Sequence, residues 1–307
     1  MMIHRLFLLL VCAGGSLSAQ VNIVFNYDYD EAGLFTGANE GRQAALQAAG
    51  DYVAGLIAPS TFAAITPNET DSWIGRVLDP RDTTQLVDVG NLAISANTIQ
   101  VYVGGAVLPE SILAYGGGGS GWAPLESTPE WAATLYFRGN EPYYRYAIGS
   151  ISFSSTTAWY FDDDIGSVEP MGGAYDFFST AIHELFHVLG VGLNGTTTWS
   201  SLVDGEGNFI GENAMAVYGG PVPLDAAQAH WANGTQSLIY GTNIAQDPLM
   251  DPYVSADERD YATALDVAAL RDLGYAVAAV PEPAAVAALM GLSALGFALW
   301  RRSRLAA

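Results

Sequence analysis

The sequence contains no lysine at all. Its eleven basic residues are therefore all arginines, and they stand against 32 aspartates and glutamates, which leaves a formal net charge of −21. An excess of negative charge this large repels nucleic acid and anionic lipid, and so argues against both as partners. It favours a soluble extracellular surface instead, and it makes Ca²⁺ a candidate cofactor.

Cysteine is almost as scarce, because Cys12 is the only one. It lies in a stretch with an early arginine, an apolar run over residues 6–13 and small residues up to position 19, the order typical of a secretory signal peptide. We therefore assign residues 1–19 to a signal peptide. Lipid attachment at Cys12 is an alternative, which the bulky Val11 before it disfavours. The mature chain then has no cysteine for a disulfide, a metal ligand or a cysteine-based latency switch.

A long apolar run occurs only near the C-terminus, over residues 284–300, and Arg301-Arg302-Ser303-Arg304 follows it directly. As a helix, this run would extend about 25 Å, slightly less than the thickness of a bilayer core. The arginines would remain on the cytoplasmic side. The run therefore predicts a short transmembrane segment.

The same tail contains Val280-Pro281-Glu282-Pro283 just before the apolar run. With this element, residues 280–307 resemble the PEP-CTERM sorting signal of Gram-negative bacteria that produce exopolysaccharide. The resemblance implies that an exosortase-type sorting enzyme recognises the Pro-Glu-Pro element and removes the tail, so that membrane anchoring is transient. A plain C-terminal membrane anchor is the alternative. Both interpretations predict export through the inner membrane to the cell surface or beyond.

Residues 20–279 are enough for one domain with a sizeable core. Periodicity predicts strands at 21–27, 98–103 and 147–154 and helices at 38–57, 176–189 and 257–273. The first strand follows the signal so closely that we expect no N-terminal prodomain. The pattern predicts an α+β fold, with a twisted mixed sheet and two long helices in an upper subdomain, 20–190. An irregular lower subdomain, 191–279, would end in a helix.

Four consecutive glycines occupy positions 116–119. A glycine-rich run can form a phosphate-binding loop, but that motif continues with Lys-Ser or Lys-Thr and a helix, and neither follows here. We therefore predict a flexible surface loop.

The segment His183-Glu184-Leu185-Phe186-His187 carries the clearest chemical signal. Residues four apart on a helix share one face, so His183 and His187 can bind one metal ion, with Glu184 beside the open coordination position. This is the His-Glu-x-x-His arrangement of zinc peptidases, although a pattern this short also occurs by chance. Two ordinary helix histidines are therefore the alternative.

Three further features favour the metal site. Only one histidine besides these two follows the signal peptide, His230, and a catalytic zinc needs three protein ligands and a water. Gly190 is placed to end the helix and turn the chain beneath the metal. Met250, in Leu249-Met250-Asp251-Pro252, looks like the methionine turn that underlies the metal in metzincins.

With these residues the chain resembles the leishmanolysin-like metzincins, in particular bacterial members that carry a PEP-CTERM tail. The common metzincin pattern places its third histidine six residues after the second, where this sequence has Leu193. Leishmanolysin-like enzymes insert a segment first, and His230-Trp231 followed by Leu249-Met250 matches their order. The resemblance covers about 177–275. It implies a metzincin-like fold and a zinc ion held by the three histidines.

Two alternatives concern the metals. Glu206 could replace His230 as the third ligand, as in thermolysin-like enzymes, but Asp204-Gly205-Glu206-Gly207-Asn208 is typical of a turn between strands. The same turn, or Asp162-Asp163-Asp164, could bind Ca²⁺. A plain hairpin and a solvated acidic loop are the simpler interpretations.

The resulting hypothesis is a secreted zinc-dependent endopeptidase acting on protein or peptide substrates. Zinc would activate a water molecule, and Glu184 would act as the general base. Tyr253 is three residues after Met250, whereas related enzymes with a tyrosine ligand use a spacing of two, so it receives no catalytic role. The alternative is a non-catalytic extracellular matrix or surface protein that retains a peptidase-like fold.

Overall fold

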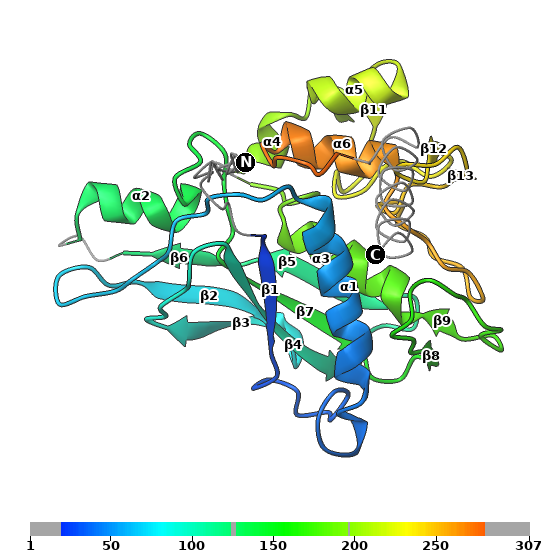
Figure 1. The fold of residues 1–307 in the computed structure, drawn as a ribbon, viewed down its shortest axis with the longest axis horizontal. Coiled ribbons are helices and arrows are strands. Elements are labelled where there is room, and N and C mark those ends of the chain that lie inside the picture. Colours follow the sequence, from blue (N-terminus) through cyan, green and yellow to red (C-terminus); the bar gives the residue numbers. More distant parts are fainter. Residues whose placement is uncertain (1–19, 124–126, 196, 280–307) are drawn as a thin grey trace, which may run out of the picture.

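The computed structural model of the chain describes residues 20–123, 127–195 and 197–279 (Figure 1). The predicted signal peptide and sorting tail, including the apolar run 284–300, lie outside these residues. The helices are α1 (Arg42–Leu56), α2 (Pro129–Phe137), α3 (Phe177–Val188), α4 (Thr198–Ser201), α5 (Glu212–Tyr218) and α6 (Ala264–Asp272), with a 3₁₀ helix η1 (Gly37–Asn39). The strands are β1 (Asn22–Asn26), β2 (Ile74–Asp79), β3 (Asp82–Gly90), β4 (Thr98–Ala106), β5 (Ala114–Gly118), β6 (Ser120–Trp122), β7 (Ile148–Ser154), β8 (Trp159–Tyr160), β9 (Tyr175–Asp176), β10 (Asn208–Phe209), β11 (Val222–Pro223), β12 (Ser237–Leu238) and β13 (Ala245–Gln246).

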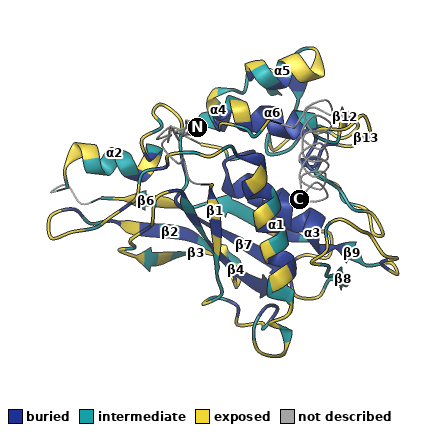
Figure 2. Cartoon of the chain, viewed as in Figure 1, coloured by how far each residue is buried: buried dark blue, intermediate teal, exposed yellow. Residues whose placement is uncertain are grey.

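The main sheet has four strands in the order β1-β4-β7-β5. The first three are parallel, and β5 runs antiparallel to β7 at the end of the sheet, so the predicted mixed sheet is confirmed. Both α1 and α3 cover one face of this sheet and pack against each other (Figure 1). In Figure 2 the central strands and α3 are the most deeply buried elements, as expected for parallel strands covered by helices.

The predicted first strand and the predicted strands at 98–103 and 147–154 are confirmed as β1, β4 and β7. The long helix at 38–57 is confirmed as α1, although its first residues belong to the 3₁₀ helix η1. Its expected stripe is buried, with Leu46, Val53 and Ile57 fully inaccessible and Leu56 nearly so. These segments were predictable because each repeats its apolar residues at the period of the element it forms.

The prediction of a flexible loop at 116–119 was wrong. Residues 114–118 form the edge strand β5, and Gly119 leads directly into β6 of a second sheet, ordered β3-β2-β6. The glycines are needed because the strand passes close to its neighbours. A Cβ atom at Gly116 would lie 2.7 Å from the backbone oxygen of Glu184, and one at Gly118 would lie 2.4 Å from the ring of Tyr146.

The part of the chain after Gly190 is less irregular than predicted. It contains α4 and α5 in addition to the closing helix, and these short helices lie together with α6 in Figure 1. The closing helix also begins later than residue 257, because Thr263 and Asp266 form a capping box that starts α6. Trp199, Phe209 and Trp231 form the aromatic core of this region, with ring centroids 4.3–5.6 Å apart.

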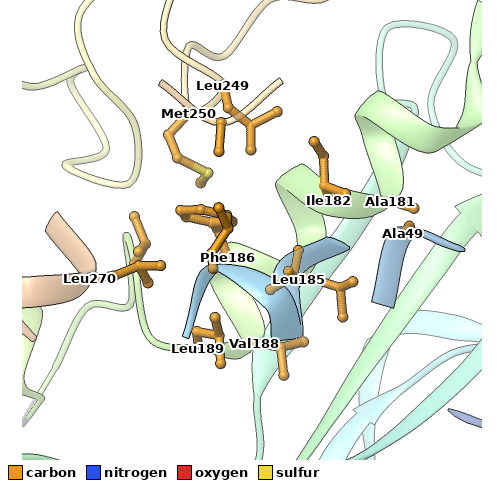
Figure 3. Close-up of a cluster of buried hydrophobic side chains, with 14 of the residues drawn as sticks. Ala49, Ala181, Ile182, Leu185, Phe186, Val188, Leu189, Leu249, Met250 and Leu270 are labelled. Carbon is orange, nitrogen blue, oxygen red and sulfur yellow. The ribbon is translucent and has the colours of Figure 1, made fainter. Parts of the chain in front are cut away.

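The methionine of the predicted turn lies in the hydrophobic core between α3 and α6. Met250 is fully buried, and Figure 3 shows its side chain pointing toward the ring of Phe186 on α3. Leu249 and Leu270 belong to the same cluster. The backbone at Met250 accepts a hydrogen bond from the Trp231 amide, so this core joins the segment that carries His230 to the base of α3.

Candidate metal centre

Helix α3 places the first two candidate ligands. It is capped by Asp176, whose side chain accepts a hydrogen bond from the Ser179 amide, and all of its residues are buried. His183 and His187 lie one helical turn apart, with their ring centroids 5.0 Å from each other. The helix therefore presents two imidazoles on one face, as their spacing requires.

The third candidate, His230, reaches the same place from the segment between β11 and β12. One nitrogen from each of the three histidines lies within 4.8 Å of the others. The Nε2 atoms of His187 and His230 are 3.2 Å apart. Two nitrogen ligands of a tetrahedral zinc ion, each bound at about 2.0–2.1 Å, are about 3.3 Å apart, so this separation fits a shared ion.

The other ring nitrogen of each histidine has its own hydrogen-bond partner. His183 Nδ1 lies 2.7 Å from the backbone oxygen of Leu249, His187 Nδ1 lies 2.8 Å from that of Val191, and His230 Nδ1 lies 3.2 Å from Asp225 Oδ2. Because all three partners are acceptors, we assign the proton to Nδ1 in each ring. The Nε2 lone pairs are thus left to converge on one point, which is the arrangement that a zinc ligand needs.

Burial keeps the three imidazoles neutral. Burial, with a smaller contribution from the neighbouring histidines, lowers the pKa of His183 and of His187 to about 3 and that of His230 to about 4. Neutral imidazoles retain the lone pair that binds a metal. The donor set, three neutral nitrogens with an open side, therefore fits Zn²⁺.

Two glycines bring the later ligand up to the helix. Gly190, at φ +107°, follows α3 in the helix-ending position expected from the sequence. Gly192, at φ +73°, makes the closer approach, since a Cβ there would lie 2.1 Å from the backbone oxygen of Ala229, next to His230. Gly192 was not identified from the sequence, because the close approach that requires it comes from Ala229, in a distant segment.

Glu184 lies beside the histidines and is 6 % exposed. Burial raises its pKa to about 8, and a backbone hydrogen bond from Gly116 on β5 partly opposes this effect. The edge strand thus contacts the carboxylate directly, although β5 and α3 are distant in sequence. A carboxyl group that changes protonation near neutral pH is suited to general acid–base chemistry.

The site opens into a cleft with a volume of about 540 Å³. Residues 110–116, which include the first three residues of β5, and residues 252–254 line it. The three histidines and Glu184 also line this cleft. Tyr253 also lines the cleft, with 71 % of its surface exposed. The cleft is large enough to hold several residues of an extended peptide.

The alternative metal ligands have other surroundings. Glu206 is exposed in the turn between Val203 and Phe209, and among the described residues the only cluster with metal-ligand geometry consists of the three histidines. Asp204 Oδ1 accepts hydrogen bonds from the Glu206 and Asn208 amides, so this turn is a capped hairpin as predicted. In the acidic loop, Asp162 pairs with Arg259 at 3.1 Å.

Two aspartates support the site, the half-buried Asp225 and the fully buried Asp266, and neither was identified from the sequence. Asp225 contacts His230, as described above. Asp266 accepts hydrogen bonds from the Trp231 indole and from the Leu249 and Met250 amides, which ties the segments around His230 and Met250 to α6. The capping-box spacing of Thr263 and Asp266 was visible in the sequence, but it indicates only a helix start.

Comparison with known proteins identifies the tail. Residues 279–303 match the PEP-CTERM protein-sorting motif, which confirms the predicted sorting tail, export and a sorting enzyme as a partner. The match covers only the tail. No curated protein matches the chain. Within the part of the chain that the structure describes, no helix is both long and apolar enough to cross a membrane.

Proposed function

We propose that the exported domain is a zinc-dependent endopeptidase of the metzincin type, with His183, His187 and His230 as zinc ligands. The observation that carries the proposal is the convergence of three neutral imidazoles whose Nδ1 atoms are all engaged, beside a buried glutamate in an open cleft. The methionine turn at Leu249-Met250, packed beneath α3, is consistent with the leishmanolysin-like order of the motifs.

The chemistry divides between the metal and the protein. When bound, zinc supplies the Lewis acid that activates a water molecule and polarises the scissile carbonyl. Glu184 takes the proton of the attacking water and delivers it to the leaving amine. Its pKa returns toward the ordinary range once the histidines hold a cation, so the carboxylate is available as a base near neutral pH.

The edge strand β5 favours a polypeptide as substrate. It ends the sheet order, so its outer edge has no strand partner among the described residues. An extended peptide can add to such an edge through main-chain hydrogen bonds. Because β5 borders the cleft and contacts Glu184, a peptide bound along it would cross the histidines. This arrangement suits cleavage within a chain.

The test is cleavage of an unstructured protein such as casein. We expect the wild-type protein to bind one zinc ion and to cleave, and a chelator to abolish cleavage until zinc is restored. Glu184→Gln should keep the zinc and lose at least about 100-fold in kcat/KM, in line with the usual contribution of a general base. Glu206→Gln, an exposed change of the same kind, serves as the control. A protein that binds zinc but cleaves no faster than its Glu184→Gln variant would instead be a non-catalytic surface protein.

The sorting tail determines where this activity would operate. We infer that a sorting enzyme cuts near Pro281-Glu282-Pro283 and releases the domain from the inner membrane. The substrates would then be extracellular or cell-surface proteins. Comparison of the mass of the exported protein with that of a variant lacking the Pro-Glu-Pro element tests this step, since an unchanged mass would exclude removal of the tail.

A further inference from the structure

The third histidine is held differently from the other two. His183 and His187 direct Nδ1 to backbone oxygens, which no side-chain substitution can remove. His230 directs Nδ1 to a side chain, the carboxylate of Asp225, at 3.2 Å. It also lies on a connecting segment rather than on a helix, so less of its orientation is determined by the backbone.

Asp225 also shapes the turn that carries His230. Its Oδ1 accepts hydrogen bonds from the amides of Ala229, at 2.9 Å, and His230, at 3.3 Å. Its own amide donates to the backbone oxygen of His230 at 3.0 Å. The two carboxylate oxygens are thus divided, because Oδ1 caps the turn and only Oδ2 faces the imidazole.

We propose that Asp225 is the positioning residue that selects the metal-binding tautomer of His230. An oxygen that only accepts keeps the proton on Nδ1 and leaves the Nε2 lone pair directed toward the other two histidines. This inference rests on the proposed function, because the lone pair matters only if the histidines bind a metal. It assigns to Asp225 a role beyond capping a turn.

The division of the two oxygens predicts an unusual result for Asp225→Asn. The amide oxygen will occupy the Oδ1 position, where two backbone N–H groups require an acceptor. The amide NH₂ then faces His230 Nδ1 and forces that nitrogen to accept, so the proton moves to Nε2 and the lone pair there is lost. Asp225→Ala removes the capping oxygen but leaves Nδ1 free to donate to water, and so keeps the correct tautomer accessible.

If Asp225 selects the tautomer, the two variants should rank in opposite orders for zinc affinity and for stability. For zinc affinity we expect wild type to exceed Asp225→Ala, and Asp225→Ala to exceed Asp225→Asn, with losses in the range of about 10–100-fold that is typical of such supporting residues. For stability to urea we expect Asp225→Asn to exceed Asp225→Ala, because it keeps the cap. A purely structural role would place Asp225→Ala last in both measurements.

The experiment uses the full chain with its sorting tail intact, kept in detergent. Two-bond ¹⁵N–¹H correlation of the metal-free protein should show Nδ1–H at His230 in wild type and Nε2–H in Asp225→Asn, with His183 and His187 unchanged. Asp204→Asn is the matched control, since Asp204 caps a turn in the same way and its side chain accepts from Glu206 and Asn208 rather than from a histidine. It should leave tautomers and zinc affinity unaltered. An Asp225→Asn protein that keeps Nδ1–H, or binds zinc as well as Asp225→Ala, overturns the inference.

The same measurements separate this inference from the proposed function. If wild type binds no zinc, the proposed function fails, while the tautomer spectrum still decides whether Asp225 controls His230. If zinc binds and casein is cleaved but the tautomer is insensitive to Asp225→Asn, the endopeptidase remains and only the positioning role is rejected.

Discussion

Replacing Gly192 by alanine tests how the third histidine is brought to the helix. A Cβ atom at this position would lie 2.1 Å from the backbone oxygen of Ala229 and 3.0 Å from Cε1 of His187. Real Cβ atoms essentially never come within 3.0 Å of another atom, so the backbone beside His230 must move by about 1 Å. Metal–ligand distances tolerate only about 0.2 Å, so a shift of this size takes His230 out of reach of an ion on the other two histidines.

The expected cost has two parts. The left-handed φ of +73° costs an alanine about 1–2 kcal/mol, and the overlap adds about 1–3 kcal/mol, so the free energy of unfolding should fall by about 2–5 kcal/mol. Gly234→Ala is the control, because Gly234 has φ +87° and no atom within 4 Å of its Cβ position. This control should lose only the cost of the left-handed φ, about 1–2 kcal/mol of the free energy of unfolding, and should still bind zinc.

Urea denaturation and competition with a zinc-binding dye measure the two effects. We expect Gly192→Ala to bind zinc at least about 100-fold more weakly than Gly234→Ala, a larger loss than the substitution of a supporting residue usually causes. If both variants lose the same stability and both keep tight zinc binding, the close approach at Gly192 does not position His230.

Two further predictions concern Gly116, which contacts Glu184, and the carboxyl group of Asp260. Gly116→Ala places a Cβ 2.8 Å from Glu184 Oε2, so we expect kcat/KM on casein to fall at least about 10-fold while bound zinc is retained; unchanged cleavage would show that β5 does not position this carboxylate. Burial raises the pKa of Asp260 to about 7, above its unfolded value, so its protonated form contributes stability at low pH that is lost as pH rises between about 4 and 7. Asp260→Asn should remove this decline. Urea denaturation at pH 5 and pH 8 measures the free energy of unfolding of both proteins, and an equal change with pH in wild type and variant would contradict the prediction.

The helices and strands that were predicted correctly are those whose apolar pattern reflects a single buried face or a fully buried run. In α1, Leu46 and Val53 repeat at helical spacing, and in β4 the alternation over residues 98–103 indicates a strand. The pair β2 and β3 was missed because β3 is largely exposed and polar, and α5 was missed because it is short and has only one fully buried residue. The strand β5 was misread because its glycines serve close packing against α3, which no local pattern reveals.

The sequence by itself determined that the chain is exported with a sorting tail, and that His183, Glu184 and His187 share one helix face. Both conclusions depend on residues close together in the chain, whose spacing sets their geometry directly. Only the tertiary structure decided that His230 rather than Glu206 joins the two helix histidines, and that Asp225, Gly192 and Gly116 surround them. Asp225 lies only five residues before His230, but the contacts of His230 with α3, of Gly192 with Ala229 and of Gly116 with Glu184 join segments that are distant in sequence. Their geometry depends on how α3, β5 and the segment before α6 pack around one core.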